Sequence, residues 1–342
     1  MSIDAKELGK RINDQHGENP FSGVIRIVEN NAVLFSGCHG YANINESIPN
    51  TVDTRFGTAS GTKTFTSVAI SRLVEQGALD FNTPIREILD VSLPAFNKSI
   101  TIHHLLTHTS GMPDYFDEEE MDDYSLLWEE NPMYKYRQPK DFLPLFQNKP
   151  MMYEPGLKWH YNNAGYILLG LIIEKIAGMP YVEYIEKNVF QYCDMSRSGF
   201  FSLDNLPQKT AFGYIEKNQA LKTNIYSVPI IGGPDGGAFC TSEDIGKFWE
   251  RLLHYDILKK QTVDAMLSPH AATDDGYYGY GIWIQKSKTD DSFFYYMLGE
   301  DPGVAFFSAF NIKRNLQITI LGSFVNSTWD MQKAIMRFVE PP

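Results

Sequence analysis

A serine and a lysine three residues apart, in the segment Ser60-Gly61-Thr62-Lys63, are the residues of this chain best suited to chemistry. On a helix these two positions share a face, so the lysine amine can reach the serine hydroxyl. A serine hydroxyl becomes a nucleophile when a base removes its proton, and burial can lower the pKa of a lysine enough for that role. The pair therefore indicates acyl transfer, with Ser60 as the nucleophile and Lys63 as its base. The alternative interpretation is a helix N-cap followed by a surface lysine.

A second group of candidates is Tyr161-Asn162-Asn163, in a loop that precedes a predicted helix over 163–176. A tyrosine phenol can carry a proton between the serine and a leaving group, and an asparagine amide can hold a substrate carbonyl. The alternative is that Asn162 or Asn163 caps the helix while Tyr161 packs as an aromatic side chain. The same Y-x-N pattern occurs at Tyr41-Ala42-Asn43, where it ends a predicted strand and is interpreted as part of a turn.

Several helices and strands with clear signals must position these residues. The pattern from 61 to 76 predicts a helix with an apolar stripe, ended by Gly77, and the helix over 163–176 is closed by Gly178 and Pro180. Leu8 and Ile12, with Ile3 before them, indicate a short amphipathic helix at the start. Two β-rich runs, 24–28 and 32–35, predict a hairpin. Aromatic and β-branched runs between 277 and 323, the first at 277–285, predict an antiparallel meander, and a last helix is expected over about 327–339.

The predicted strands lie at both ends of the chain and the predicted helices in its middle. The expected fold class is therefore α/β (α+β), an antiparallel sheet flanked by helices with a mostly helical domain inserted in it. We expect the sheet domain to comprise residues 1–78 and 222–342, and the helical domain residues 79–221. A chain of 342 residues can form a core that needs no metal or disulfide.

The composition argues against several classes of function. With 30 Lys and Arg against 42 Asp and Glu, the net charge of −12 disfavours nucleic acid and anionic membranes as partners. No apolar run is long enough for a transmembrane helix, and the start MSIDAKELGKRIND lacks the apolar segment of a secretory signal, so a cytoplasmic location is expected. Cys38, Cys193 and Cys240 are far apart without a CxxC pair, so neither a disulfide framework nor a zinc site is expected.

Six segments of the chain together resemble the class C β-lactamases and penicillin-binding-protein-like serine hydrolases. They occur in that family's order and cover most of the chain from about 21 to 325: FGTASGTKTFTSVAI, LDFNTPIREIL, ITIHHLLTHTSGMPDY, EPGLKWHYNNAGYILLGLIIEKIAGMPY, GGPDGGAFCTSEDIGKF and YGYGIWI. The resemblance implies a β-lactamase/transpeptidase-like fold with the active-site cleft between the two domains. It implies Ser60 as the acylated nucleophile, Lys63 as its base partner, Tyr161 as the proton relay and Asn163 as a substrate contact.

The chain departs from that family at its third motif. β-Lactamases and D,D-peptidases of this type carry K-[ST]-G on a strand beside the cleft, and the matching stretch here is Met297-Leu298-Gly299, followed by Glu300, Asp301 and a Pro-Gly pair. The resemblance implies that Met297, Leu298 and Gly299 lie at the substrate site, and that the backbone N–H groups of Ser60 and Glu300 form the oxyanion hole. The string His108-Thr109-Ser110-Gly111 belongs to the family's HTSG turn and is not counted as the third motif.

This departure has a predictable effect on substrate choice. The motif lysine binds the carboxylate of a β-lactam or a terminal D-alanine, and Met297 cannot supply that charge. A charge-assisted hydrogen bond contributes about 1.5–3 kcal/mol, roughly 10–150-fold in affinity. Glu300 and Asp301 add negative charge nearby, so we expect poor binding of carboxylates and a preference for apolar or cationic substrates. The missing lysine also removes a positive neighbour that would help to keep Lys63 neutral, which predicts a weaker base.

Two other groups of polar residues are given structural interpretations. The acidic run Asp117–Asp123 is expected to be a solvated loop rather than a pocket wall. His104 and His108, with His103 beside them, have the spacing of helical metal ligands, but no acidic partner is indicated and no metal is expected.

His160, beside Tyr161, is expected to be packed rather than to polarise the site. The glycine-rich stretch Gly232–Gly237 lacks the Lys-Ser/Thr of a phosphate loop. We interpret it as a tight turn before a helix that begins near Ser242.

The main hypothesis is a serine hydrolase that forms an acyl-enzyme on ester or amide substrates, needs no cofactor, and takes a small-molecule or peptide-like partner. A second hypothesis is a β-lactamase or D,D-carboxypeptidase that recognises the substrate carboxylate through another cation; the basic residues between Ile284 and Asp301 are Lys286 and Lys288, in a predicted turn. A third is a catalytically idle binding or sensory module that kept the fold. The sequence leaves the oligomeric state open.

Overall fold

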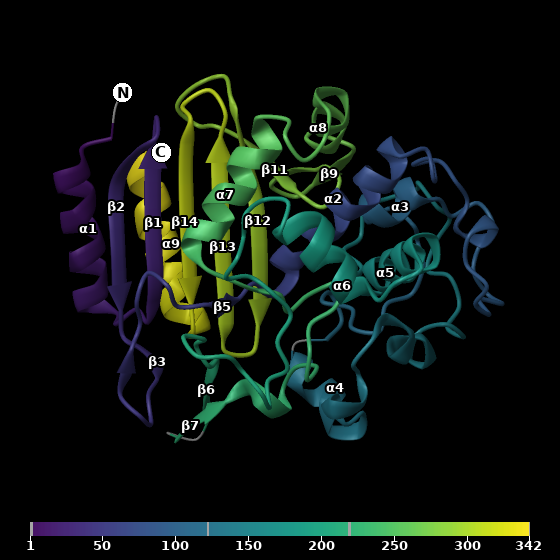
Figure 1. The fold of residues 1–342 in the computed structure, drawn as a ribbon, viewed down its shortest axis with the longest axis horizontal. Coiled ribbons are helices and arrows are strands. Elements are labelled where there is room, and N and C mark those ends of the chain that lie inside the picture. Colours follow the sequence, from purple (N-terminus) through teal and green to yellow (C-terminus); the bar gives the residue numbers. More distant parts are fainter. Residues whose placement is uncertain (1–2, 122, 218–219, 342) are drawn as a thin grey trace.

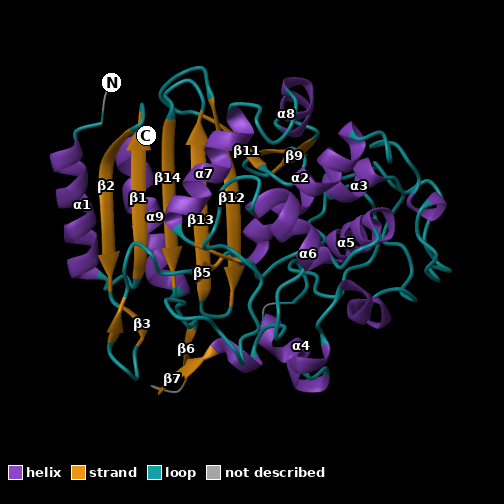
Figure 2. Cartoon of the chain, viewed as in Figure 1, coloured by secondary structure: helices purple, strands orange, loops and turns teal. Residues whose placement is uncertain are grey.

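The computed structural model describes residues 3–121, 123–217 and 220–341. Within these ranges, an eight-stranded antiparallel sheet forms the centre of one part of the molecule, and helices cover both of its faces (Figures 1 and 2). The strand order is β2-β1-β14-β13-β12-β11-β10-β9, so strands from both ends of the chain share one sheet. This architecture confirms the predicted α/β fold class.

The helices and strands have the following bounds. The helices are α1 (Ala5–Glu18), α2 (Thr62–Glu75), α3 (Ile102–Leu106), α4 (Tyr124–Glu130), α5 (Asn163–Ala177), α6 (Tyr181–Ile185), α7 (Ser242–Leu253), α8 (Lys260–Met266) and α9 (Val325–Val339). The large sheet contains β1 (Gly23–Glu29), β2 (Ala32–His39), β9 (Ala271–Thr273), β10 (Gly276–Tyr278), β11 (Trp283–Lys286), β12 (Phe293–Asp301), β13 (Val304–Asn311) and β14 (Leu316–Gly322). Short pairs are formed by β3 (Tyr41–Asn43) with β4 (Ile48–Pro49), β5 (Phe56–Gly57) with β8 (Phe239–Cys240), and β6 (Tyr214–Lys217) with β7 (Ala220–Thr223).

The two ends of the chain meet where β1 pairs with β14, from Gly23 opposite Gly322 to Glu29 opposite Leu316. The helices α1 and α9 pack together on one face of the sheet, where Leu8 of α1 belongs to the same buried apolar cluster as β1 and α9. The predicted hairpin at 24–35 and the predicted terminal helices are confirmed, with α9 beginning two residues earlier than expected.

The run 277–285, expected to be one strand, is divided between β10 and β11 by a turn. The reason is the close approach of this turn to α2: Gly281 has a φ of +70°, and a Cβ there would lie 2.0 Å from Ser67 Oγ. Only glycine combines this left-handed backbone with so little space. The turn thereby fastens the edge of the sheet to the helix that follows Ser60.

The remainder of the chain surrounds α2 and α5, which pack against each other (Figure 1). Both predicted helices are confirmed, and α5 ends at Gly178 with a φ of 65°. The buried side of α2 is wider than the predicted apolar stripe and includes Lys63, Thr66 and Ser71. The predicted domain border at 221/222 falls inside β7, and the division into two domains stays a prediction.

No single helix in the described residues is both long and apolar enough to cross a membrane. By length and composition alone, one pair of segments bent by 76°, Asn163–Ala177 with Tyr181–Phe190, passes the same test.

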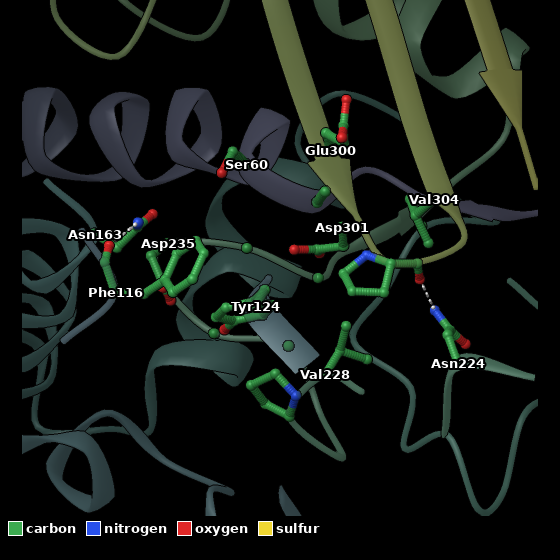
Figure 3. A pocket seen from close by; sticks show the side chains of 18 of the residues that line it. Ser60, Phe116, Tyr124, Asn163, Asn224, Val228, Asp235, Glu300, Asp301 and Val304 are labelled. Carbon is green, nitrogen blue, oxygen red and sulfur yellow. Dashed lines mark hydrogen bonds between the residues drawn. The ribbon is translucent and has the colours of Figure 1, made fainter. Parts of the chain in front are cut away.

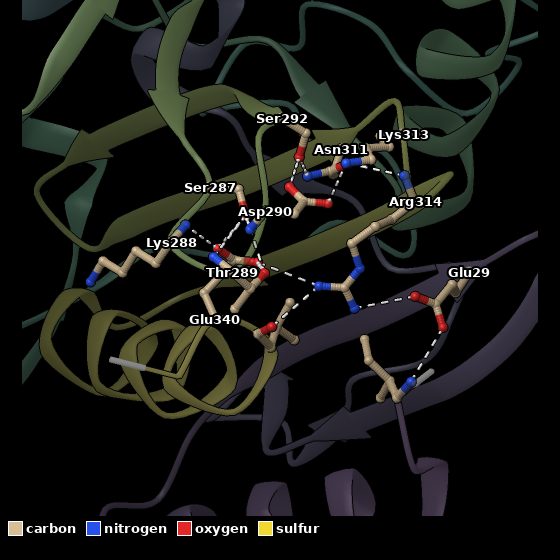
Figure 4. A network of polar contacts seen from close by, with 12 residues as sticks. Glu29, Ser287, Lys288, Thr289, Asp290, Ser292, Asn311, Lys313, Arg314 and Glu340 are labelled. Atoms are coloured by element: carbon tan, nitrogen blue, oxygen red, sulfur yellow. Dashed lines mark hydrogen bonds and ion pairs between the residues drawn. The ribbon is translucent and has the colours of Figure 1, made fainter. Parts of the chain in front are cut away.

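A buried polar network joins the far end of the sheet to α9 (Figure 4). Arg314 lies 3.2 Å from a carboxylate oxygen of Glu29 and 3.4 Å from one of Glu340. The Glu340 carboxylate also accepts hydrogen bonds from Ser287 Oγ at 2.8 Å and from the Lys288 N–H at 2.7 Å. These contacts fix the turn between β11 and β12, and therefore the start of the strand that reaches the site.

Candidate active site

Ser60 lies in a short 3-10 turn, Ala59–Gly61, that leads directly into α2. Ala59 has a φ of 42°, a conformation that costs a non-glycine residue free energy unless the surroundings enforce it. Its carbonyl accepts a hydrogen bond from the N–H of Gly237 at 3.2 Å. The serine is thus presented on a constrained turn at the N-terminal end of a helix.

Lys63 is buried beside Ser60, and its Nζ lies within hydrogen-bond distance of three oxygens. The distances are 2.9 Å to Ser60 Oγ, 2.7 Å to Asn163 Oδ1 and 2.7 Å to the main-chain oxygen of Asp235. The amide oxygen and the main-chain carbonyl can only accept hydrogen bonds, whereas a hydroxyl can also donate. A neutral amine satisfies this set of partners, because it donates two N–H bonds to the acceptors and offers its lone pair to the Ser60 proton. That is the geometry a general base requires.

Two opposing effects set the charge state of Lys63. Burial lowers its pKa, because the ammonium loses its hydration inside the protein. Negative charge acts the other way and comes from four carboxylates: Asp235, Glu118, Asp114 and Asp301. Burial is the larger effect, so the pKa of Lys63 falls below its ordinary value. The carboxylates favour the charged form of Lys63. The absence of the motif lysine was expected to act in the same direction, because it removes a positive neighbour that would keep Lys63 neutral.

Tyr161 lies close enough to Ser60 for the serine side chain to affect the pKa of its phenol. Its ring centroid is 4.9 Å from Lys63 Nζ, 4.4 Å from the ring of His108 and 6.1 Å from the ring of Trp283, on which it stacks. Burial raises the pKa of the Tyr161 phenol well above its usual range, and the Ser60 side chain opposes this shift. The phenol therefore stays protonated at neutral pH and can act as a proton donor.

His108 belongs to the turn that sequence reasoning treated as structural, and the structure gives it a direct contact with Tyr161. Its Nδ1 accepts the N–H of Asn162 at 3.1 Å, and it is buried with a left-handed φ of 57°. Burial and the neighbouring Lys63 lower the pKa of His108 well below its usual range. A neutral imidazole therefore supports one face of the Tyr161 ring.

The start of α5 places Asn163 against Lys63. Asn162 is the N-cap, and its side chain accepts the Gly165 N–H at 2.7 Å. The buried carboxylate of Asp114 accepts the N–H groups of Asn163 at 2.5 Å and Ala164 at 2.9 Å. Burial raises the pKa of Asp114 to about 7, against the effect of these bonds. No local pattern marks Asp114 in the sequence, because these partners lie 49 and 50 residues further along the chain.

The strand β12 carries the residues at the altered third motif, and it packs tightly against the serine turn. A Cβ on Gly299 would lie 2.1 Å from the carbonyl oxygen of Thr58 and 2.9 Å from the backbone nitrogen of Ser60, so glycine is required there. The side chain of Met297 is 1% exposed and belongs to the main core. Leu298 points to the opposite face of the strand. Met297, Leu298 and Gly299 are brought near Ser60, and their contact with substrate stays a prediction.

One edge of β12 is open beside the serine. The strand β11 pairs with Phe293–Tyr296 alone, and in the described chain Met297–Asp301 pair on one side only, with β13. The hairpin closes through Pro302 and Gly303, so the Asp301 carbonyl faces the Val304 N–H. Bonded and non-bonded pairs alternate along an antiparallel ladder, which turns the N–H of Glu300 outward, away from β13. This is the direction that an oxyanion-hole donor needs.

A cavity of about 630 Å³ opens next to Ser60 (Figure 3). In the part of the chain that the structure describes, no lysine, arginine or histidine lines it, whereas five carboxylates do: Glu118, Asp123, Asp235, Glu300 and Asp301. The expected solvated loop at 117–123 is thus partly a pocket wall, since Glu118 and Asp123 come from it; Asp122 lies outside the described residues. The remainder of the wall is largely apolar or aromatic, and includes Phe116 and Tyr124.

A second cavity, of about 650 Å³, lies on the Trp283 side of Tyr161. Three tryptophans and a leucine give it an apolar wall: Trp159, Trp283, Trp329 and Leu298. Its lining also contains four basic side chains: Lys286, Lys288, Lys333 and Arg337. Sequence reasoning found the first two, but not the two on α9, because helix α9 approaches β12 only in the folded chain. Figure 3 shows the Glu300 side chain directed away from the first cavity, and its carboxylate accepts a hydrogen bond from Trp329.

His104 and His160 both contact polar protein groups. The Nδ1 of His104 lies 3.1 Å from the N–H of Thr101, as part of a helix cap. Among the described residues, no cluster of three potential metal ligands occurs. His160 is 4% exposed and lies between the carboxylates of Asp117 and Glu119, each 3.0 Å from a ring nitrogen.

The glycine-rich stretch forms the predicted tight turn, in which the N–H of Gly233 donates to the carbonyl of Gly236 at 2.7 Å. The turn also brings the Asp235 carbonyl to Lys63, a contact that sequence reasoning missed. A main-chain oxygen leaves no residue-type signal, so nothing in the sequence could have indicated it.

Comparisons with known proteins point to one protein family. Residues 12–337 match the protein family described as Beta-lactamase. The crystal structure of a penicillin-binding protein from Bacillus halodurans is 46% identical, with a TM-score of 0.90, and the match covers 96% of this chain and 98% of that one. An octameric penicillin-binding protein homologue from Pyrococcus abyssi is 26% identical, with a TM-score of 0.84, over 98% of this chain and 78% of that one.

Among curated proteins, penicillin-binding protein 4* of Bacillus subtilis (strain 168) is 29% identical over 291 residues. The match covers 79% of this chain and 61% of that protein, so the chain spans less than two thirds of its length. With the family match over nearly the whole sequence and the fold shared with solved relatives, the chain belongs to the β-lactamase family of serine hydrolases.

Proposed function

We propose that this protein is a serine hydrolase that cleaves esters or amides through an acyl-enzyme on Ser60. The observation that carries the proposal is the set of partners around Lys63 Nζ: two oxygens that can only accept hydrogen bonds and one hydroxyl that can donate. This arrangement supports a neutral lysine that takes the serine proton. Membership of a family of serine hydrolases supports the same chemistry.

In the proposed reaction, Lys63 accepts the Ser60 proton while the serine oxygen attacks the substrate carbonyl. The N–H groups of Ser60 and Glu300 stabilise the oxyanion that forms. Tyr161, which is protonated, gives a proton to the leaving group as the carbonyl–heteroatom bond breaks, and the proton that Lys63 took from Ser60 restores the phenol. A water molecule then attacks the acyl-enzyme, and Ser60 recovers its proton as the acid is released.

Asn163 has a positioning role in this scheme. Its Oδ1 accepts from Lys63, while its Nδ2 lies 3.3 Å from both the Phe116 carbonyl and Glu118. Both ends of the amide therefore have protein partners. A substrate carbonyl would have to replace one of the two longer Nδ2 contacts, which is how the expected substrate contact of Asn163 can still form.

Substrates without a carboxylate fit this site best. The position of the family's motif lysine holds Met297, whose side chain is buried in the core, and the cavity beside Ser60 is lined by acids. A carboxylate placed there would lose hydration without gaining a cationic partner. We therefore favour esterase-like or peptidase-like hydrolysis over β-lactam hydrolysis.

Labelling by a fluorophosphonate probe tests the nucleophile. The wild-type protein should react and should hydrolyse a chromogenic short-chain ester, and Ser60→Ala should do neither. Ser71→Ala is a matched control, because Ser71 is a buried serine on the same helix with no hydrogen-bond partner for its hydroxyl among the described residues. Equal labelling of Ser60→Ala and wild type would refute Ser60 as the nucleophile.

A second candidate function is penicillin-binding or D,D-carboxypeptidase activity. Lys333 and Arg337 on α9, together with Lys286 and Lys288, line the second cavity and offer another source of positive charge for a carboxylate. Relatives named as penicillin-binding proteins agree with this alternative. Stable acylation of Ser60 by a fluorescent penicillin would favour it. A folded protein that labels with neither probe, and hydrolyses no ester or D-amino-acid amide, would favour an idle binding module.

A further inference from the structure

Asp301 differs from the other acids of the cavity beside Ser60. Its carboxylate points into the cavity (Figure 3), from the same face of β12 as Gly299, which packs on the Ser60 backbone. In the described residues it has neither a hydrogen bond nor an ion pair. A half-buried carboxylate left without a partner at a cavity wall is costly, which makes it a candidate for contact with a ligand.

The other four acids of the cavity each have a protein partner. Asp235 accepts from Tyr115, and Glu300 accepts from Trp329. Glu118 lies 3.3 Å from Asn163 Nδ2, and Asp123 accepts the Ser125 N–H at 2.8 Å while capping α4. Of these five acids, Asp301 is the one whose carboxylate has no hydrogen bond or ion pair among the described residues.

The amine of Lys63 cannot serve as the missing partner. Lys63 lies close enough to lower the pKa of Asp301, but its Nζ is already engaged with Ser60, Asn163 and Asp235. Burial raises the pKa of Asp301 to about 8, and the neighbouring Asp235, Glu118 and Glu300 add to that shift. With its pKa raised, Asp301 gains or loses its proton near neutral pH, so a positively charged ligand beside it would stabilise the ionised form.

The position of Asp301 indicates which part of a substrate would reach it. Tyr161, the proposed donor to the leaving group, stacks on Trp283, and Trp283 lines the second cavity. A leaving group that takes its proton from Tyr161 would then lie toward the second cavity. The cavity beside Ser60 is left for the acyl part of the substrate.

We propose that Asp301 is a specificity-determining residue, which selects substrates whose acyl part carries a positively charged ammonium group. This inference rests on the proposed hydrolase function. No bond is made or broken at Asp301: the carboxylate pairs with the ammonium and holds the acyl carbonyl in register with Ser60.

The test compares p-nitrophenyl esters of one acyl chain length that end in trimethylammonium, in tert-butyl, or in a sulfonate. The first two groups have nearly the same shape, so the ratio of their kcat/KM values reports charge alone. Wild type should prefer the cationic ester by tenfold or more. Asp301→Asn should reduce that preference at least tenfold, and Asp301→Lys should shift preference toward the sulfonate. Glu120→Gln, an exposed acid outside the cavity lining, is the control for net charge and should keep the wild-type ratio.

Binding to the Ser60→Ala protein separates this inference from the proposed function, because it needs no turnover. Calorimetry with the trimethylammonium amide and its tert-butyl analogue should show tighter binding of the cation, lost when Asp301→Asn is added. Since the ammonium charge is permanent and the acid has a pKa of about 8, affinity should rise about tenfold from pH 7 to pH 9. The carboxylates of Asp235, Glu118 and Glu300 and the amine of Lys63 are present in both proteins, so a flat profile in the Asp301→Asn background assigns the effect.

Equal binding of the two analogues, or an unchanged preference in Asp301→Asn, would overturn the proposal. Selective binding without any hydrolysis or Ser60 labelling would uphold the cation site and overturn the hydrolase instead.

Discussion

Replacing Gly299 with alanine should disable the site without unfolding the protein. The new Cβ would lie 2.1 Å from the Thr58 carbonyl oxygen, where ordinary contacts begin at 3.4 Å, and 2.9 Å from the Ser60 nitrogen. Both opposing atoms are backbone, so either β12 or the serine turn must move by about 1 Å or more. A displacement of that size costs about 100-fold in rate. Overpacking of this kind destabilises a protein by about 1–3 kcal/mol.

The assay measures kcat and KM on a chromogenic ester, the rate of fluorophosphonate labelling, and the free energy of unfolding in urea. We expect kcat and the labelling rate to fall together by about 100-fold, because the Ser60 and Glu300 N–H groups no longer converge on one oxygen. Gly17→Ala is the matched control, since a Cβ at Gly17 on α1 meets nothing within 4 Å. Wild-type kcat in a Gly299→Ala protein would refute the claim that the packing of β12 on the serine turn aligns the oxyanion hole.

Three further predictions concern separate parts of the molecule. Tyr161→Phe should lower kcat by about 100-fold or more on amides, whose leaving group needs a proton, and less on aryl esters; an equal loss on both substrates would contradict the proton-donor role. Glu340→Ala should lower the free energy of unfolding by about 1–3 kcal/mol, because the partly buried Arg314 keeps only Glu29 as a carboxylate partner among the described residues and the Ser287 hydroxyl loses its acceptor; a change below about 0.5 kcal/mol in urea titrations would show that the network of Figure 4 contributes little. Burial raises the pKa of Asp301 to about 8 from an ordinary 3.8, so the folded state binds a proton that the unfolded chain releases between these values. Asp301→Asn should therefore gain stability relative to wild type as pH rises from 4 to 8, and unfolding curves with a constant difference would reject this.

The parts of the fold that follow from local sequence patterns were predictable. The alternation in β1 and the caps of α5 are encoded within a few residues, so their bounds were found nearly correctly. The division of 277–285 into two strands was missed, because the cause is the approach of Gly281 to Ser67 on a distant helix. Local β-propensity cannot indicate such a contact.

The candidate site follows the same rule. Ser60 and Lys63 share one turn of chain, and Tyr161 and Asn163 share another, so their patterns were visible. The Asp235 carbonyl, 172 residues from Lys63, has no residue-type signature. Asp114 was missed because its role depends on backbone N–H groups of a helix that begins 49 residues later.

The open edge of β12 also bears on whether the protein self-associates through its sheet. Residues 297–301 of this strand are paired on one side only in the described chain, so the outward backbone groups of Leu298 and Glu300 have no strand partner, and such an open edge can pair with a neighbouring molecule. The unpaired stretch is short, ends at Pro302 and carries the exposed carboxylate of Glu300, so a second copy of the strand would meet like charge and could form few hydrogen bonds. A small extended substrate needs few hydrogen bonds and carries no like charge, so neither feature opposes its binding. The same residues can therefore bind a substrate while disfavouring the strand-to-strand association that leads to fibrils.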